Sequence, residues 1–159
     1  CLKPEYLIVD GYTIIFAWDE LKALAKVNLD SAREALIEIL ENYQGYRKCN
    51  VVAVFDAYRV KGGTDHTEKI GDLEVVFTGE GETADTYIER MTYEMKKKYL
   101  VRVASSDTLE QMIATGNDAL RMSAEDLRKE IELVNDEISA FLEEYKRKNR
   151  TESINRIKL

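Results

Sequence analysis

The sequence predicts an α/β fold with a mostly parallel central sheet of four to five strands and a long C-terminal helix. Two observations carry this prediction. Short apolar runs alternate with helix-patterned segments along the 159 residues, and this alternation is typical of right-handed βαβ crossovers. The chain then ends in a sustained helical stripe of apolar residues. The length suits one domain, residues 1–159, with a self-sufficient core.

The predicted strands are short apolar runs bounded by turn residues, as expected for a buried sheet. They are, in chain order, Tyr6–Val9, Val51–Phe55, Leu73–Phe77, Leu100–Ala104 and a short fifth strand over Ala119–Met122. Residues 57–72, between the second and third strands, contain three glycines and several charges. This composition predicts a long polar loop or a small hairpin.

Helices are predicted between the strands. The apolar run Ile14–Trp18 opens the first helix. Ser31–Glu34 is a capping-box pattern that starts the next one, with Gly45 at its end. A further helix runs from about Ala84 to Lys98, and another covers residues 107–116. Together with the strands, these segments complete the alternating pattern.

A last helix opens at Ser123–Asp126. Apolar residues recur at spacings of four and three from Leu127 to Tyr145, which forms a stripe along one face. The stripe has two interpretations: a helix packed on the domain's own surface, or a dimer or partner contact. The resulting division is an α/β core over residues 1–122, an amphipathic helix over 123–149 and a frayed basic tail over 150–159.

Composition narrows the function classes. The net charge of −7 argues against broad, nonspecific coating of nucleic acid, although RNA contact through a local basic patch is compatible with it. Cys1 and Cys49 form no CxxC pair, so we expect reduced thiols and no zinc site. No apolar run approaches the roughly 18 residues of a membrane helix, and no signal peptide is visible. We therefore expect a cytoplasmic protein.

Aspartates follow the strand-like runs. Asp10 and Asp56 directly follow the first two, while Asp85 and Asp107 lie just beyond the third and fourth. If these strands are parallel, the carboxylates meet at the carboxyl edge of the sheet, where open α/β sheets bind ligands. Crowded carboxylates need a cation or protons between them. The pattern indicates a site for Mg²⁺ or Mn²⁺ of the kind used in phosphate chemistry.

Each acid also has a purely structural interpretation. Asp107 precedes a predicted helix and could be its N-cap. Asp85 falls in the first turn of a helix, where a carboxylate is favoured, and Asp56 could be a turn residue. Asp10 is the hardest to explain in this way, because it closes an apolar strand and precedes Gly11, where backbone can approach a ligand. The coincidence of all four favours the metal site.

The sequence lacks the motifs of several other nucleotide-binding and catalytic families. No GxxxxGK[ST] and no GxGxxG after a strand occurs. His66 is the only histidine and lies in a polar segment without a nucleophile elbow, so we expect it to be a surface residue or an RNA contact. A haloacid-dehalogenase-like phosphatase requires a second acid two residues before Asp10, where Ile8 stands.

Five blocks of the chain, in order, resemble the YacP-like NYN domains of the PIN-like nuclease superfamily. They are LIVDGYTIIFAW (7–18), VFDAYRVKG (54–62), VFTGEGETAD (76–85) continuing to Ile88-Glu89, ASSD (104–107) with Glu110-Gln111, and the GxxA and RxSA elements of 116–124. The resemblance covers nearly the whole chain up to about residue 145. It implies a PIN-like three-layer α/β/α fold and metal-dependent endoribonuclease activity, with messenger RNA and the ribosome as partners.

Carried over by position, the resemblance implies an acidic site of Asp10, Asp85 and Asp107, which bind one or two Mg²⁺ or Mn²⁺ ions. Asp56 completes this site, and Glu82 is a further ligand or supports the ligands. Gly11, Thr13 and Ser106 are expected to support these acids. Thr13 departs from the family, which usually has Asn there. Its shorter hydroxyl reaches less far, so we expect activity with an altered substrate preference.

The expected reaction is hydrolysis of RNA by a metal-activated water, with Asp56 or Glu82 orienting that water. RNA would cross the same edge of the sheet. The expected phosphate-binding cations are Arg59, Lys61, Lys69, Arg90 and Arg121, and the aromatic candidates for stacking on bases are Tyr12, Tyr58 and Trp18.

Two non-enzymatic alternatives stay open. One is a noncatalytic RNA- or ribosome-binding module on the same scaffold, for which Thr13 and the acidic balance speak. The other is a protein-interaction domain that acts through the last helix, as a monomer or a weak homodimer.

Overall fold

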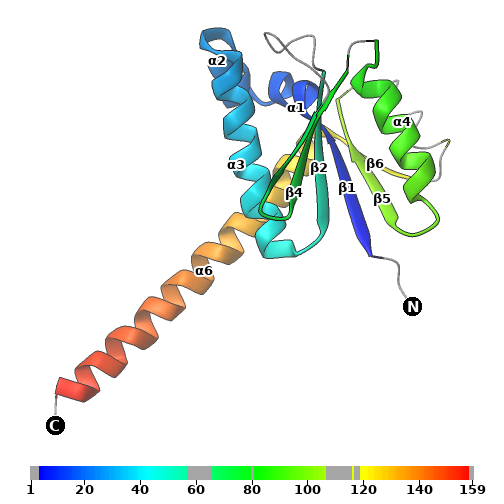
Figure 1. The fold of residues 1–159 in the computed structure, drawn as a ribbon. Helices are drawn as coiled ribbons and strands as arrows, with labels where there is room; N and C mark the ends of the chain where they lie inside the picture. The colour runs from blue at the N-terminus through cyan, green and yellow to red at the C-terminus, as the bar shows by residue number, and fades with distance from the viewer. Residues whose placement is uncertain (1–3, 57–65, 80, 107–115, 117–118, 158–159) are drawn as a thin grey trace.

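The residues that the structure describes fold around a six-stranded sheet with helices on both faces (Figure 1). The structure is a computed structural model that describes residues 4–56, 66–79, 81–106, 116 and 119–157, with side chains up to Asn149. The strands are β1 (Glu5–Asp10), β2 (Asn50–Asp56), β3 (His66–Ile70), β4 (Leu73–Thr78), β5 (Leu100–Ala104) and β6 (Leu120–Met122). The helices are α1 (Gly11–Ala17), α2 (Asp19–Val27), α3 (Leu29–Arg47), α4 (Ala84–Met95) and α6 (Ala124–Ile157).

The strand order is β3-β4-β2-β1-β5-β6, and every neighbouring pair is parallel except β3 with β4. The sheet therefore exceeds the expected four to five strands by the edge strand β3. This strand forms a hairpin with β4, and Gly71 in the turn has a φ of +61°. Its residues are mostly exposed, so β3 lacks the apolar run that marked the other strands.

Alternation along the strands divides the core into two layers. Leu7 and Val9 of β1 face the cluster built with α1, α3 and α6. Tyr6 and Ile8 face the opposite cluster, which includes Ile88 of α4. Figure 1 shows α2 and α3 on one side of the sheet and α4 on the other. This is the expected three-layer α/β/α arrangement with a mostly parallel sheet.

Both boundaries of α3 differ from the sequence prediction. α3 begins earlier than Ser31, because Asn28 is its N-cap and its Oδ1 accepts hydrogen bonds from the backbone N–H of Asp30 (2.9 Å) and Ser31 (3.4 Å). The same helix continues past Gly45 to a left-handed Lys48 with a φ of 54°. Asn and Ser both cap helices well, and here the earlier residue takes the role.

α6 begins at the predicted place. Ser123 Oγ accepts from the backbone N–H of Asp126 at 3.0 Å, and Asp126 Oδ2 accepts from that of Ser123 at 3.4 Å. The helix continues through Ile157, so the prediction of a helix ending at Asn149 with a frayed tail was too short. Figure 1 shows its C-terminal half projecting away from the sheet.

Only the first part of the apolar stripe of α6 packs on the domain's own surface. Leu127, Ile131 and Val134 are buried against the sheet, whereas Phe141 and Tyr145 are 68% and 57% exposed. The first part of the stripe is therefore core. The second part extends beyond the core.

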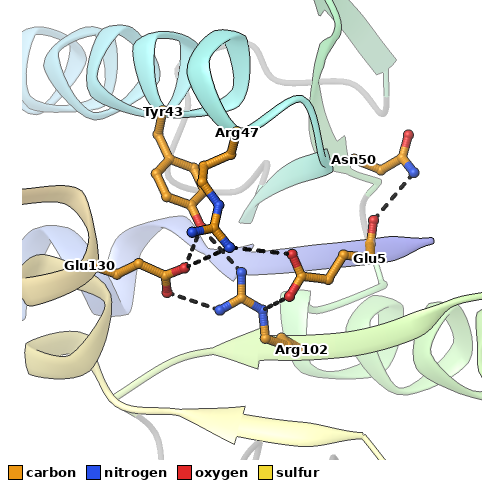
Figure 2. Close-up of polar contacts among 6 residues, drawn as sticks. All are labelled: Glu5, Tyr43, Arg47, Asn50, Arg102 and Glu130. Carbon is orange, nitrogen blue, oxygen red and sulfur yellow. Dashed lines mark hydrogen bonds and ion pairs between the residues drawn. The ribbon is translucent and has the colours of Figure 1, made fainter. Parts of the chain in front are cut away.

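An ion-pair network fixes the docked part of α6 to the sheet (Figure 2). Arg102 of β5 lies between Glu130 of α6, with Nη1 to Oε2 at 2.9 Å, and Glu5 of β1, with Nε to Oε1 at 3.2 Å. Tyr43 of α3 donates its hydroxyl to Glu130 Oε1 at 2.8 Å. Burial alone would raise the pKa of Glu130, but the hydrogen bonds from Arg102 and Tyr43 lower it.

The described residues bear on two expectations from composition, which concern membrane helices and cysteine thiols. None of their helices combines the length and apolarity required to cross a membrane. Cys49 is a buried free thiol, and burial raises its pKa.

Candidate functional site at the carboxyl edge of the sheet

Four polar side chains lie near the carboxyl ends of the parallel strands: Asp56 is level with Thr78, whereas Asp10 is level with Val54, two residues before Asp56. Strand register determines this, because side chains two residues apart share a face. Asp10 continues the face of Ile8, and Asp56 continues the face of Val54. In strand order, these edge residues are Thr78 (β4), Asp56 (β2), Asp10 (β1) and Ser105 (after β5). All four therefore lie on the face that α4 covers, at the edge predicted for the site.

Asp10 is the most deeply placed carboxylate, with 4% of its surface exposed. It is the N-cap residue of α1, yet its side chain makes no capping hydrogen bond to that helix. Ser105, which is fully buried, donates its hydroxyl to Asp10 Oδ2 at 3.4 Å. A buried carboxylate that is not used as a cap is an unusual feature for a structural residue.

Thr13 ties α1 to the end of β5. Its Oγ1 lies 3.2 Å from the Asp10 carbonyl oxygen, 3.2 Å from Ser105 Oγ and 3.3 Å from the Ser106 amide that donates to it. Ser106 donates its own hydroxyl to the Thr13 carbonyl oxygen at 3.1 Å. Thr13 and Ser106 thus hold the backbone around Asp10, which agrees with a supporting role.

Asp56 holds the N-terminus of α4. Its Oδ1 accepts from the backbone N–H of Ala84 at 2.5 Å. Thr83 caps the same helix by accepting from the Thr86 amide at 3.2 Å. The backbone of Asp85, the residue after Ala84, therefore lies beside Asp56 at the end of β2.

Glu82 lies beside the same helix and is engaged. Its Oε1 is 2.7 Å from Nη1 of Arg90. The Arg90 guanidinium also lies 5.2 Å from the centre of the Tyr87 ring. Glu82 and Arg90 therefore interact with each other in this conformation, and the predicted RNA contact of Arg90 would compete with this ion pair.

The structure brings only part of the predicted acidic site together. Within the described ranges, no three acids, histidines or cysteines lie close enough to hold a metal ion. Asp107, which the resemblance assigns as a ligand, lies outside the described residues. Asp10 and Asp56 lie at the carboxyl edge through the register of β1 and β2, and the backbone of Asp85 follows Ala84 beside Asp56, but these three described acids do not form such a cluster.

Gly11 has a packing role. A Cβ at this position would lie 2.1 Å from Cε1 of Phe55, which is fully buried. The residue that follows Asp10 must therefore be Gly so that the Phe55 ring fits beneath the start of α1.

Tyr12 and Trp18 do not fit the base-stacking role considered for them. Tyr12 is 4% exposed and packs edge-on against Phe55, with its hydroxyl 3.3 Å from Arg33 Nη1. Trp18 is 5% exposed and donates its Nε1–H to the Ala124 carbonyl oxygen at 2.9 Å. Both rings belong to the core.

The predicted cations are spread over the sheet and α4. Lys69 on β3, Arg90 on α4 and Arg121 on β6 are exposed. Arg59, Lys61 and Tyr58 lie outside the described residues. His66 stacks on Phe77 with the ring centres 4.5 Å apart.

Sequence reasoning did not select Ser105 and Thr78. Both are almost completely buried, at 0% and 2% exposed. Their positions in the strands mark them as site residues. Each lies on the same alternating face as the apolar residues before it, at a strand end level with an aspartate. Reading that signal requires the strand register.

Comparison with known proteins places these features in one family. Residues 7–158 match the YacP-like NYN domain. An uncharacterized protein YacP from Bacillus subtilis (strain 168) is 40% identical over 131 residues, which cover 82% of this chain and 76% of that protein.

Two solved structures are similar over most of the chain. The crystal structure of Rae1 (YacP) from Bacillus subtilis has a TM-score of 0.78 at 33% identity and covers 94% of this chain and 86% of that one. Its W164L mutant has a TM-score of 0.78 at 35% identity, with 89% and 84% covered. These matches agree with the PIN-like α/β/α layers described above.

Proposed function

Because this chain belongs to the YacP-like NYN domain family, a nuclease-like family, we propose that it is a metal-dependent endoribonuclease that hydrolyses RNA phosphodiester bonds. Messenger RNA associated with the ribosome is the proposed substrate, in a cytoplasmic setting. The proposal goes beyond the family assignment in its reaction, its metal and its substrate.

The observation that carries the proposal is the hydrogen bond from the Ala84 amide to Asp56 Oδ1. It joins the start of α4 to the end of β2, and this contact supports a position of Asp85, the residue after Ala84, near the edge that holds the buried Asp10. A cap alone would explain Asp56. It would not explain a carboxylate at Asp10 that is 4% exposed and does not cap α1.

The chemistry of these residues fits a hard divalent cation. Asp10 and Asp85 supply carboxylate oxygens, the ligands that Mg²⁺ and Mn²⁺ prefer. We propose that these two residues and Asp107 hold the ion. When bound, a metal of this kind lowers the pKa of a coordinated water and offsets charge on the reacting phosphate.

The chain's own residues would prepare the site for this reaction. Ser105 and Thr13 orient the Asp10 carboxylate and the backbone that follows it. Asp56 docks α4 through its Oδ1, which accepts from the Ala84 amide. In the hydrolysis, water would attack phosphorus and lose a proton to a carboxylate at the edge, while the bond to the leaving ribose oxygen breaks and that oxygen takes up a proton from solvent. Asp56 Oδ2 and Glu82 are the proposed acceptors.

RNA binding would rely on local cations, since the chain has a net charge of −7. Lys69, Arg90 and Arg121 are exposed candidates for phosphate contact, together with Arg59 and Lys61. If the basic residues from Lys146 onward also contact RNA, affinity should fall steeply as salt rises.

Cleavage of a labelled RNA by the full chain tests the proposal. We expect cleavage with Mn²⁺, none with EDTA, and a large loss for Asp85→Asn. Glu94→Gln is the matched control, because Glu94 is an exposed acid further along α4, and it should cleave like the wild type. Cleavage that survives both EDTA and Asp85→Asn would reject the assignment.

A second candidate is a noncatalytic RNA- or ribosome-binding module. It is favoured by Thr13 in place of the usual Asn and by Asp56, which serves as a helix cap. Under this alternative the wild type and Asp85→Asn bind RNA equally well, and neither cleaves it with any divalent cation.

A further inference from the structure

A small polar pocket lies next to the edge residues, between β4 and the start of α4. Its volume is about 150 Å³, and its lining residues include Thr67, Val76, Thr78, Glu82, Tyr87 and Arg90. Thr78 is level with Asp56 in the parallel β2–β4 register. The pocket is therefore a direct neighbour of the carboxylate that docks α4.

Thr78 is the unexplained residue of this pocket. Its side chain is 2% exposed, and its Oγ1 finds no hydrogen-bond partner among the residues that the structure describes. A buried hydroxyl without a partner is costly, and native structures usually avoid it unless a ligand or water completes the bond. The hydroxyl therefore indicates that something polar enters the pocket.

The walls of the pocket fit a neutral, flat, polar-edged ligand better than an anion. Arg90 lines it, and Glu82 Oε1, 2.7 Å from Arg90 Nη1, already balances the charge of Arg90. His66 also lines it, with its Nε2 3.3 Å from Glu68 Oε1. The Glu82–Arg90 pair presents both donors and acceptors to the pocket, as the edge of a nucleobase requires. Tyr87, which is half-buried, contributes an aromatic ring beside the Arg90 guanidinium, and bases stack on such surfaces.

We propose that this pocket binds one nucleobase of the RNA strand, next to the phosphate held at the carboxyl edge. The inference rests on the proposed function in taking RNA as the substrate. Thr78 completes its hydrogen bond with the base, Tyr87 supplies a stacking surface, and the Glu82–Arg90 pair meets the edge of the base. The pocket would thus fix which nucleotide lies beside the acidic site.

Binding without metal tests the pocket separately from catalysis. The probes are fluorescein-labelled single-stranded RNA hexamers of uniform sequence and an abasic ribose-phosphate hexamer of the same charge, measured by anisotropy in EDTA. The wild type should bind at least one base-containing hexamer more tightly than the abasic one. The loss of one hydrogen bond predicts that Thr78→Val weakens this binding roughly 2- to 12-fold. Affinity for the abasic hexamer should stay unchanged.

Two further readouts keep the test sharp. Thr78→Val should leave the melting temperature of the free protein equal or higher, because it removes a buried hydroxyl without a partner. A structural role would lower it. Tyr87→Leu should weaken binding of the base-containing hexamer roughly 5- to 150-fold. Tyr93→Leu is the matched control on α4, since Tyr93 is 62% exposed and does not line the pocket.

The outcomes separate the two proposals. If the wild type binds RNA but prefers no base-containing hexamer over the abasic one, or if Thr78→Val binds as the wild type does, the base pocket is rejected and the nuclease proposal stands. If the wild type binds no RNA hexamer in EDTA, the base pocket is rejected, and cleavage of labelled RNA with Mn²⁺ decides the nuclease proposal separately.

Discussion

Replacing Asp56 separates its structural role from its role in the acidic site. Asp56 Oδ1 accepts from the Ala84 amide at 2.5 Å, at the positive end of the α4 dipole. A hydrogen bond to an ionised group is worth about 1.5–3 kcal/mol, and a carboxylate at a helix N-terminus adds about 0.3–1 kcal/mol. Asp56→Ala removes both. We therefore expect a loss of about 2–4 kcal/mol in the free energy of unfolding without metal.

Asp56→Asn should cost less, about 1–2 kcal/mol, because its amide oxygen still accepts from Ala84 while the charge is lost. Urea unfolding in EDTA measures both variants. With a slope near 2 kcal/mol/M, Asp56→Ala should lower the midpoint by about 1–2 M at an unchanged slope. The control Glu94→Gln should stay within about 0.5 kcal/mol of wild type.

The opposite result is also informative. If Asp56 served chiefly as one of several crowded carboxylates, its removal without metal would relieve repulsion with Asp10 and Asp85. Asp56→Ala would then be as stable as the wild type or more stable. That outcome would refute the role of Asp56 in capping α4 and would favour Asp56 as a ligand of the proposed metal ion.

Three further substitutions test other parts of the account. Glu130→Gln should lower the free energy of unfolding by about 1–3 kcal/mol at pH 7. Arg102 and Tyr43 lower the pKa of Glu130 in the folded protein, so its contribution is present above the unfolded pKa near 4.3 and is lost as pH falls through the folded pKa. The unfolding midpoints of the wild type and the variant should therefore converge in acid. Gly11→Ala forces a Cβ into the Phe55 ring and should cost at least about 1–3 kcal/mol in a thermal melt, whereas Gly45→Ala, which meets nothing within 4 Å, should not destabilise. Thr13→Val removes the hydrogen bonds to Ser105 and Ser106, so the rate of RNA cleavage should fall even at temperatures where the variant is fully folded. A cleavage rate that falls only as the folded fraction falls would make Thr13 merely structural.

The buried strands were predictable because the sheet is covered on both faces. β1, β2, β4 and β5 are apolar runs for that reason, and each lies within about a residue of its predicted bounds. β3 is an exposed edge strand of polar residues, so no hydrophobic pattern marked it. Its existence depends on pairing with β4, which only the three-dimensional structure reveals.

The candidate site was predictable in part. Topology brings Asp10 and Asp56 to one edge, as a parallel sheet requires. The bond between Asp56 and Ala84 was not foreseeable, because it depends on how α4 sits above the sheet. Tyr12 illustrates the same limit, since it neighbours the site in sequence but its ring enters the core. Local sequence specifies strand ends well, whereas side-chain direction follows from packing.

A crystal of the full chain soaked in Mn²⁺ provides the most direct test of the central claim. Anomalous scattering locates the ion independently of any activity. The account predicts a peak at the carboxyl edge of the sheet, bound by carboxylate oxygens of Asp10 and Asp85 and abolished in Asp10→Asn. An ordered edge that carries no peak at saturating Mn²⁺, or a peak that avoids both residues, would contradict it.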